Sequence, residues 1–210
     1  MGKSAQVLII DYGMGNLRSV MNAFESLGCP AKIAHHPEEL RAGERIVLPG
    51  VGAFGDGMEH LRTSGWLDVL EEEVRQKGKL FLGLCLGMQL LATTGTEHGI
   101  HSGFGWIPGI ANRICTNDPM LRVPQIGWND VRFIKRDGLY AGLGDSQTFY
   151  FVHSYILSPN DPAVVSGICV HGEEFAASIE ADNIFATQFH PEKSQKAGLA
   201  VLQNFLDMRK

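Results

Sequence analysis

The first half of the chain alternates continuous apolar runs with segments in which apolar residues recur at helical spacing. Continuous apolar runs are typical of strands buried on both faces, and helices between them predict parallel neighbours joined by crossovers. We therefore expect a three-layer α/β fold with a doubly wound, mostly parallel central sheet and helices on both faces. The predicted strands are 7–10, 31–34, 46–48 and 80–82, and the predicted helices are 17–27, a short one from Pro37, and 58–77 with a break near Gly65.

The second half, beyond Gly99, is richer in Gly and Pro, and its apolar segments are shorter and more alternating. This pattern predicts an antiparallel strand region in the C-terminal half, with a hairpin turn at Asp182 and Asn183. No repeat, low-complexity tract or linker divides the chain, which predicts a single domain over 1–210. The expected strands are 109–115, 126–133, 148–157, 164–170, 174–180 and 184–189, followed by a helix over 194–208 with Leu199, Leu202, Phe205 and Leu206 on its buried face.

Composition narrows the function classes. With 210 residues, 44% hydrophobic and 20% charged, the chain suits one large soluble domain. A net charge of -5 without a basic stripe argues against a nucleic-acid partner. The N-terminal apolar run, Val7 to Ile10, is too short for a signal peptide core or a membrane span. No metal motif or CxxC pair accompanies the scattered cysteines, so we expect no metal, no cofactor and a cytoplasmic location; the cysteines are Cys29, Cys85, Cys115 and Cys169.

The run KLFLGLCLGMQLL carries the first candidate for chemistry. Its segment from Gly83 to Gly87 has the pattern of a nucleophile elbow with Cys85 in place of serine, in which a buried strand turns sharply into a helix. Only small neighbours tolerate the backbone dihedrals of such a turn. The start of the helix would favour the reactive thiolate, and Leu86 would present its N–H to a developing oxyanion. A lone buried cysteine is more often a small core residue.

The second candidate is FHPE, far along the chain, in which Pro191 separates His190 from Glu192. Proline disfavours helix at the preceding residue, and in an extended segment residues two apart point the same way. The carboxylate would then hold the imidazole in one tautomer and stabilise its cation. A nucleophile, a base and an orienting carboxylate together predict covalent catalysis by cysteine.

A glycine-rich turn at the end of the third predicted strand belongs to the same site. Sites in doubly wound sheets form at the carboxyl ends of the strands, so Pro49 to Gly52 would face the cavity that holds Cys85. Glycines on both sides of Val51 would let its peptide reorient and aim an N–H at an oxyanion. The string DYGMGN is not a dinucleotide fingerprint, because the third glycine of that pattern would fall at Arg18.

The pairing of GLCLGMQ with FHPE resembles the class I, or triad, glutamine amidotransferase family, which releases ammonia from glutamine through a cysteinyl thioester. Within the family, nearly the whole chain is similar to the glutaminase subunits of imidazole glycerol phosphate synthase. The strings that carry this similarity are DYGMGNLRSV, LPGVGAFG, VPQIGWN, YFVHSY and FHPEKS. One departure is Gln125, which stands where the family string has a histidine.

The resemblance implies a role for each matched position. It makes Cys85 the nucleophile, His190 the general base and acid, and Glu192 its orienting partner. The implied oxyanion donors are Val51 and Leu86; the implied glutamine-binding residues are Gly50, Gly52, Gln89, Ser154 and Tyr155; and the positions near a synthase interface are Asn16, Arg18, Trp128 and Lys193.

The resemblance also implies a partner. The chain shows no phosphate loop or second domain to hold an ammonia acceptor, so the ammonia would pass through a protected channel to a (βα)8 cyclase subunit in a heterodimer. That subunit would make imidazole glycerol phosphate and aminoimidazole carboxamide ribotide in histidine biosynthesis. Three alternatives stay open: the same glutaminase feeding an amidino-sugar pathway of surface polysaccharides, a cysteine peptidase or γ-glutamyl hydrolase on a similar sheet, and a regulatory subunit without activity.

Overall fold

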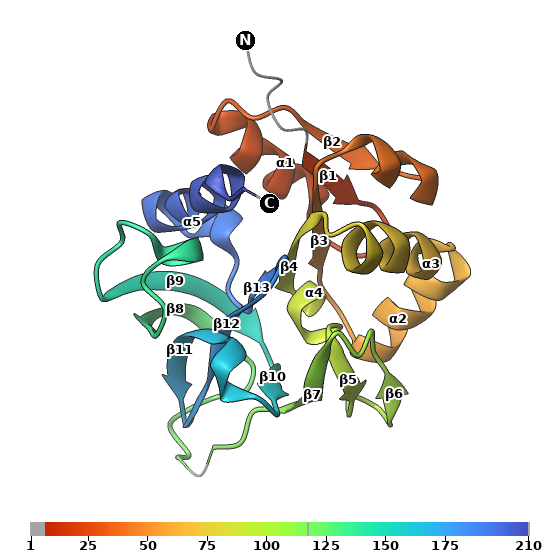
Figure 1. The fold of residues 1–210 in the computed structure, drawn as a ribbon. Helices are drawn as coiled ribbons and strands as arrows, with labels where there is room; N and C mark the ends of the chain where they lie inside the picture. Colours follow the sequence, from red (N-terminus) through yellow and green to blue (C-terminus); the bar gives the residue numbers. More distant parts are fainter. Residues whose placement is uncertain (1–6, 117, 210) are drawn as a thin grey trace.

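A computed structural model describes residues 7–116 and 118–209, so both ends of the expected 1–210 domain and Asn117 lie outside the described residues. The fold is built on a nine-stranded sheet whose order is β2-β1-β3-β4-β13-β12-β11-β8-β9 (Figure 1). Its first five strands are parallel. They are β2 (Ala31–Ala34), β1 (Val7–Ile10), β3 (Arg45–Gly50), β4 (Leu80–Cys85) and β13 (Ile184–Thr187). The apolar runs predicted this for the four strands of the first half, whereas β13 was expected in the antiparallel region and instead pairs in parallel with β4 and antiparallel with β12.

The other half of this sheet is antiparallel, as the alternating segments predicted. The hairpin between the last two strands turns at Asp182 and Asn183, which confirms that prediction: Ala181 pairs with Ile184, and Asp182 has φ 52°. The antiparallel strands are β12 (Glu173–Ala181), β11 (Val165–His171), β8 (Gln125–Phe133) and β9 (Ser146–His153).

A second sheet of four strands corrects one expectation and includes two strands that the sequence did not predict. The segment 148–157 is not one strand: it divides at Ser154, where β9 leaves the large sheet and β10 (Tyr155–Pro159) enters the small one. Two of its strands follow the elbow and carried no clear periodicity in the sequence. The order is β10-β7-β5-β6, with β7 (Ile107–Arg113), β5 (Ala92–Gly95) and β6 (His101–Ser102).

Helices cover both faces of the parallel half (Figure 1). On one side lie α1 (Leu17–Ser26) and α5 (Gln195–Asp207), and on the other lie α2 (Phe54–Thr63), α3 (Trp66–Leu70) and the π-helical turn η2 (Glu71–Gln76). The predicted break is confirmed at Gly65, whose φ of 76° ends α2 and starts α3. Short turns complete the fold: η1 (Pro37–Ala42), α4 (Leu86–Gln89), η3 (Gly138–Tyr140), η4 (Pro162–Val164) and η5 (Pro191–Lys193).

Two apolar clusters hold these layers together, and the strands alternate between them. Leu8 and Ile10 of β1 pack toward α2 and α3, whereas Val7 and Ile9 pack toward α1 and α5. This alternation follows from the two-residue period of a strand, and it explains why the runs are apolar throughout. The buried face of α5 differs slightly from the expected one, because Leu199 and Leu206 are only partly buried; its buried residues are Gly198, Val201, Leu202 and Phe205.

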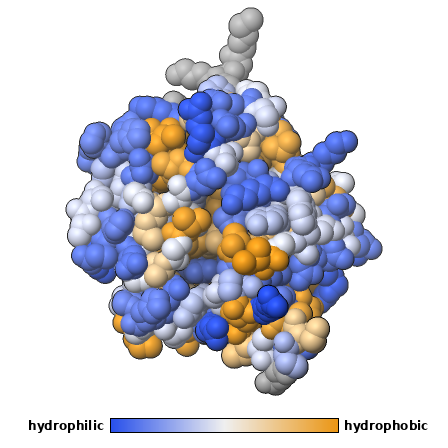
Figure 2. Space-filling model, turned by 180° about the vertical axis from the view of Figure 1, so that it is seen from behind, coloured by the Kyte–Doolittle hydropathy of each residue, from blue (hydrophilic) through white to orange (hydrophobic). Residues whose placement is uncertain are grey.

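The surface carries scattered hydrophobic side chains. Figure 2 shows several separate hydrophobic patches divided by hydrophilic areas on the face it presents. No helix within the described ranges is long and apolar enough to cross a membrane. The exposed large hydrophobic residues include Val51, Ile100, Ile110, Met120, Ile126, Trp128, Ile134 and Val170.

Arg45 ties the end of α5 to the sheet. Its buried guanidinium donates from Nε to the carbonyl of Phe205 at 3.3 Å, and from Nη2 to the carbonyls of Leu206 and Met208 at 2.7 Å each. The last carbonyls of a helix have no partner inside the helix, so this side chain replaces water as their donor.

We predict that Arg45→Met lowers the free energy of unfolding by about 2–4 kcal/mol, because charged hydrogen bonds are lost and buried carbonyls become unpaired. Urea denaturation measures the change. Arg41→Met is the control: Arg41 is exposed and pairs with Glu38 and Glu72, and its loss should cost about 1 kcal/mol or less. An equal loss of unfolding free energy in the two variants would contradict the role of Arg45 in holding the end of α5.

Candidate active site

The nucleophile elbow is present at Cys85, the last residue of β4. Its φ of 53° and ψ of -106° turn the chain sharply into α4. The flanking glycines are required by close approach: a Cβ on Gly83 would lie 2.6 Å from the carbonyl oxygen of Gly87, and one on Gly87 would overlap the carbonyl of Leu48. The helix after the elbow, α4, is a single turn of four residues. Any helix-dipole effect on the sulfur of Cys85 therefore comes from that one turn.

His190 and Glu192 are paired, as predicted, but the backbone between them is not extended, as was expected. Glu192 lies in the short helical turn η5, with His190 as its N-cap, and the two residues do not share an extended segment. The turn brings Nδ1 of His190 to 2.8 Å from Oε1 of Glu192. A carboxylate only accepts, so Nδ1 donates. The backbone N–H of His190 donates to the carbonyl of Tyr150 at 2.9 Å, which fixes the position of the residue beside β9.

The other ring nitrogen of His190, Nε2, is buried and has no hydrogen-bond partner within the described residues. His190 as a whole is 4% exposed. Burial lowers the pKa of His190, but interactions with Cys85 and with Glu192 outweigh it and raise that pKa to about 10. The surroundings therefore favour an imidazolium beside the sulfur, and an imidazolium stabilises a neighbouring thiolate.

Amide side chains hold the sulfur in place. Nε2 of Gln188 donates to Sγ of Cys85 at 3.6 Å, and Nε2 of Gln89 donates to Oε1 of Gln188 at 3.2 Å and to the carbonyl of Tyr155 at 2.9 Å. The thiol also faces the carbonyl of Val152 at 3.9 Å. Gln188 was not predicted as a site residue. Its signal was the position two residues before His190, at the end of a strand beside β4.

His153, behind this group, is kept neutral. Burial lowers its pKa to about 4. Its Nδ1 is 3.0 Å from the carbonyl of Tyr155, so Nδ1 carries the proton and donates, and Nε2 accepts. The side-chain amide of Gln125 lies 3.1 Å from Nε2 and satisfies it when turned to present its NH2 group. Gln125, the departure from the family string, is thus a buried partner of His153.

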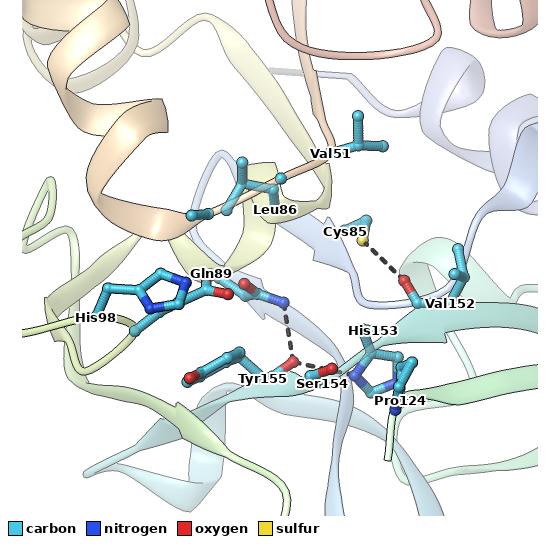
Figure 3. A pocket seen from close by; sticks show the side chains of 13 residues that line it. Val51, Cys85, Leu86, Gln89, His98, Pro124, Val152, His153, Ser154 and Tyr155 are labelled. Carbon is cyan, nitrogen blue, oxygen red and sulfur yellow. Dashed lines mark hydrogen bonds between the residues drawn. The ribbon is translucent and has the colours of Figure 1, made fainter. Parts of the chain in front are cut away.

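Cys85 opens into a cavity of about 480 Å³ (Figure 3). Cavities of a few hundred Å³ suit small-molecule ligands. Most of the predicted substrate-binding and oxyanion residues line it: Val51, Gly52, Leu86, Gln89, Ser154 and Tyr155. Gly50 does not line it. It is buried below the turn, where a Cβ would overlap the hydroxyl of Tyr12.

The register of the sheet explains how the glycine-rich turn meets the elbow. Gly50 of β3 pairs with Cys85 of β4, so Val51 continues one residue beyond the level of the sulfur. Figure 3 shows Val51 and Leu86 on the same side of the cavity as Cys85, with Gln89 and Tyr155 across from them. The carboxyl ends of two adjacent parallel strands thus deliver both proposed oxyanion donors to one place.

Several lining residues were not predicted from the sequence, and two of them, Glu97 and His98, have polar side chains on the segment after β5. Oε2 of Glu97 accepts the backbone N–H of Phe54, the first residue of α2, at 3.0 Å. This bond fixes a carboxylate in the cavity wall. The segment that carries it connects β5 to β6, and only the placement of that small sheet brings it to the site.

The expected interface residues are all exposed and fall into two groups. Trp128 of β8 packs edge-on against Tyr150 of β9, with ring centroids 5.9 Å apart, and Nζ of Lys193 lies 5.8 Å from the same ring. Asn16 and Arg18 are at the start of α1, where Oδ1 of Asn16 accepts the backbone N–H of Ser19 at 3.3 Å. Helix α1 contacts η5, the turn that carries Lys193.

The described residues hold no group of three or more His, Cys, Asp or Glu side chains that would suit a metal ion.

The model of the family "Glutamine amidotransferase class-I" matches residues 8–208. The chain belongs to the class-I glutamine amidotransferase family. The amidotransferase family was predicted from GLCLGMQ and FHPE, and the match confirms that prediction and the enzyme class. It also covers both halves of the chain, including the strands that the sequence left unassigned.

Full-length relatives narrow the resemblance within the family. The imidazole glycerol phosphate synthase subunit HisH of Geobacter sulfurreducens is 45% identical over 208 residues, which cover 97% of this chain and 99% of that protein. The subunit named HisH 1 of Campylobacter jejuni serotype O:23/36 is 43% identical over 199 residues, which cover 95% and 98%. The predicted similarity to glutaminase subunits of this synthase is confirmed.

Solved structures confirm the predicted fold class. The structure of PurLQS from Thermotoga maritima superposes with a TM-score of 0.77 at 21% identity and covers 97% of this chain and 98% of that one. A crystal structure of a glutamine amidotransferase superposes with a TM-score of 0.73 at 19% identity, covering 95% and 97%. At sequence identities of 19% and 21%, the structural similarity supports the fold and not a shared function.

We predict that His153 makes this amidotransferase lose stability in mild acid. The pKa of His153 is about 4 in the folded chain, against 6.5 for an ordinary histidine. The unfolded chain therefore binds the proton first, and stability falls as pH drops from 6.5 to 4, by about 3 kcal/mol for a difference of this size. His153→Asn keeps an amide N–H near Nδ1 and removes the titration.

Denaturation at several pH values measures the difference between the two proteins. The wild type should lose about 3 kcal/mol more than His153→Asn over this interval, because the other titrating groups are common to both. Parallel stability curves would contradict a neutral, buried His153.

Proposed function

We propose that this amidotransferase is the glutaminase subunit of an imidazole glycerol phosphate synthase in histidine biosynthesis. It hydrolyses L-glutamine to glutamate and ammonia and passes the ammonia to a (βα)8 cyclase subunit. The observation that carries the proposal is the sulfur of Cys85 at a cavity of about 480 Å³, next to the His190 and Glu192 pair. The full-length similarity to synthase subunits supports the choice of pathway.

In the proposed reaction the sulfur of Cys85 attacks the side-chain amide carbon of glutamine, and the C–N bond breaks as His190 gives a proton to the departing ammonia. Water, deprotonated by His190, then attacks the thioester, the C–S bond breaks and glutamate leaves. The negative oxygen formed in both steps is stabilised by the N–H groups of Val51 and Leu86. One such donor is typically worth about 3 kcal/mol in the transition state.

Charge complementarity supports a place for the rest of the substrate. The α-ammonium group of glutamine needs a carboxylate, and the cavity wall presents Glu97, fixed by its bond to Phe54. Gln89, Ser154 and Tyr155 would hold the remaining polar groups. We assign Glu97 this role in substrate binding.

The exposed aromatic and charged residues support a partner surface. Trp128 is 49% exposed although it is a large aromatic residue, a type enriched where proteins meet. We propose that Trp128, Lys193, Asn16 and Arg18 meet the cyclase subunit in a cytoplasmic heterodimer, and that ammonia crosses there in a protected channel.

Gln125 does not favour the amidino-sugar alternative. It is 3% exposed, and its side-chain neighbours are His153 and Cys169, so the change from histidine adjusts the core behind the cavity. Neither the peptidase nor the regulatory alternative has a feature of the structure in its favour, because the cavity, the triad and the full-length relatives all suit glutamine hydrolysis.

We predict that Cys85→Ala abolishes glutamine-dependent synthesis by the assembled complex and leaves ammonia-dependent synthesis nearly intact. Without the sulfur no thioester forms, whereas added ammonia bypasses the glutaminase. Steady-state assays with each nitrogen source measure both rates. Normal turnover with glutamine in this variant would remove Cys85 from the nucleophile's role.

We predict that Glu97→Gln raises KM for glutamine about tenfold or more and changes kcat little, because it removes a charge that binds substrate and transition state alike. The side-chain amide oxygen introduced at position 97 still accepts the backbone N–H of Phe54. The control is Glu59→Gln, an exposed residue paired with Arg62 on the outside of α2. An unchanged KM in Glu97→Gln would exclude this carboxylate from the substrate site.

A further inference from the structure

Tyr12 is a buried residue to which the proposed reaction gives no role. It follows β1 and is 3% exposed, and its hydroxyl has no hydrogen-bond partner among residues 7–116 and 118–209. Burial raises the pKa of Tyr12 far above its usual range, and the charge of Cys85 adds to that. The hydroxyl therefore keeps its proton and is a donor without an acceptor. Such groups are rare in folded proteins, because an unpaired buried hydroxyl costs about 1–3 kcal/mol.

The neighbours of this hydroxyl belong to the proposed oxyanion turn. A Cβ on Gly50 would overlap the Tyr12 oxygen, so the hydroxyl lies directly against Gly50. The rest of the loop follows the turn: a Cβ on Gly15 would be 3.5 Å from the carbonyl carbon of Pro49, and one on Gly52 would be 2.7 Å from Cε of Met14. Tyr12 does not line the cavity. It packs behind the turn, and the cavity lies in front.

This position matters because of the geometry of a peptide bond. The N–H and C=O of one peptide point in opposite directions. When the N–H of Val51 points at an oxyanion beside Cys85, the carbonyl of Gly50 must point away from the cavity, into the protein. A buried carbonyl needs a donor. The donor without a partner at that place is the hydroxyl of Tyr12.

We propose that the hydroxyl of Tyr12 donates to the carbonyl of Gly50 in the reactive state and so holds the N–H of Val51 toward the oxyanion. The inference rests on the proposed function, since it assumes the glutaminase reaction. Tyr12 is then a positioning residue: it touches neither glutamine nor the reacting atoms. Because the bond exists only with the peptide in its reactive orientation, it lowers the barrier and leaves substrate binding unchanged.

Tyr12→Phe in the assembled complex tests the proposal, since it removes one oxygen and keeps the ring. We expect kcat for glutamine hydrolysis to fall about tenfold, the effect of about 1.4 kcal/mol, with KM for glutamine unchanged. Ammonia-dependent synthesis should be unchanged. The free energy of unfolding should stay the same or rise, because the substitution removes a hydroxyl that is unpaired at rest.

Tyr140→Phe is the matched control. Tyr140 is fully buried, and its hydroxyl donates to Oγ of Ser178 at 2.6 Å, in the other half of the sheet. This variant should lose stability and keep kcat, the reverse of the pattern expected for Tyr12→Phe.

Three results would overturn the inference: full kcat in Tyr12→Phe, a raised KM at constant kcat, or an equal fall of the ammonia-dependent rate. Failure of the proposed function is a separate result. In that case the wild-type complex itself would not hydrolyse glutamine, or Cys85→Ala would still do so.

Discussion

The site depends on one strained residue, Cys85. A positive φ outside glycine costs about 1–3 kcal/mol and persists only where the surroundings enforce it. Here β4 is hydrogen-bonded on one side to β3 and on the other to β13. The backbone at Gly83 also lies so close to Gly87 that the turn at Cys85 has to be tight. The strain lifts the sulfur out of the strand and to the edge of the cavity. A relaxed Cys85 would lie in the sheet with the other core residues.

The arrangement of strands explains why distant segments meet at that sulfur. The carboxyl ends of β3, β4 and β13 are neighbours in the parallel half, so they bring together Val51, Cys85 and the segment from Gln188 to His190. The antiparallel half adds the opposite wall through the junction of β9 and β10 at Ser154. Under the proposed function, the parallel strands thus carry the reacting groups, and the change of sheet at Ser154 forms part of the wall that would contact glutamine.

The sequence predicted what local patterns encode and missed what only packing determines. Cys85 and its elbow, the parallel strands and the break at Gly65 each have a pattern within a few residues, and each is present. The contact between His190 and Glu192 was predicted correctly although the predicted backbone was extended. A short helical turn brings the two side chains together just as an extended segment would. Glu97 and Gln188 were missed since nothing near them in sequence shows that they end at the cavity. The division at Ser154 was missed because both sheets accept the same apolar pattern.

The unpaired buried polar atoms are concentrated around Cys85. Within residues 7–116 and 118–209, the buried side-chain atoms without a hydrogen bond are the hydroxyl of Tyr12, Nε2 of His190 and Oε2 of Glu192. All three belong to residues around Cys85, while the amides of Gln89 and Gln188 beside them are satisfied. Random imperfections would be scattered through the core. A gathering of unpaired atoms at one centre is what we expect if the proposed reaction forms hydrogen bonds in its transition state that the resting protein lacks.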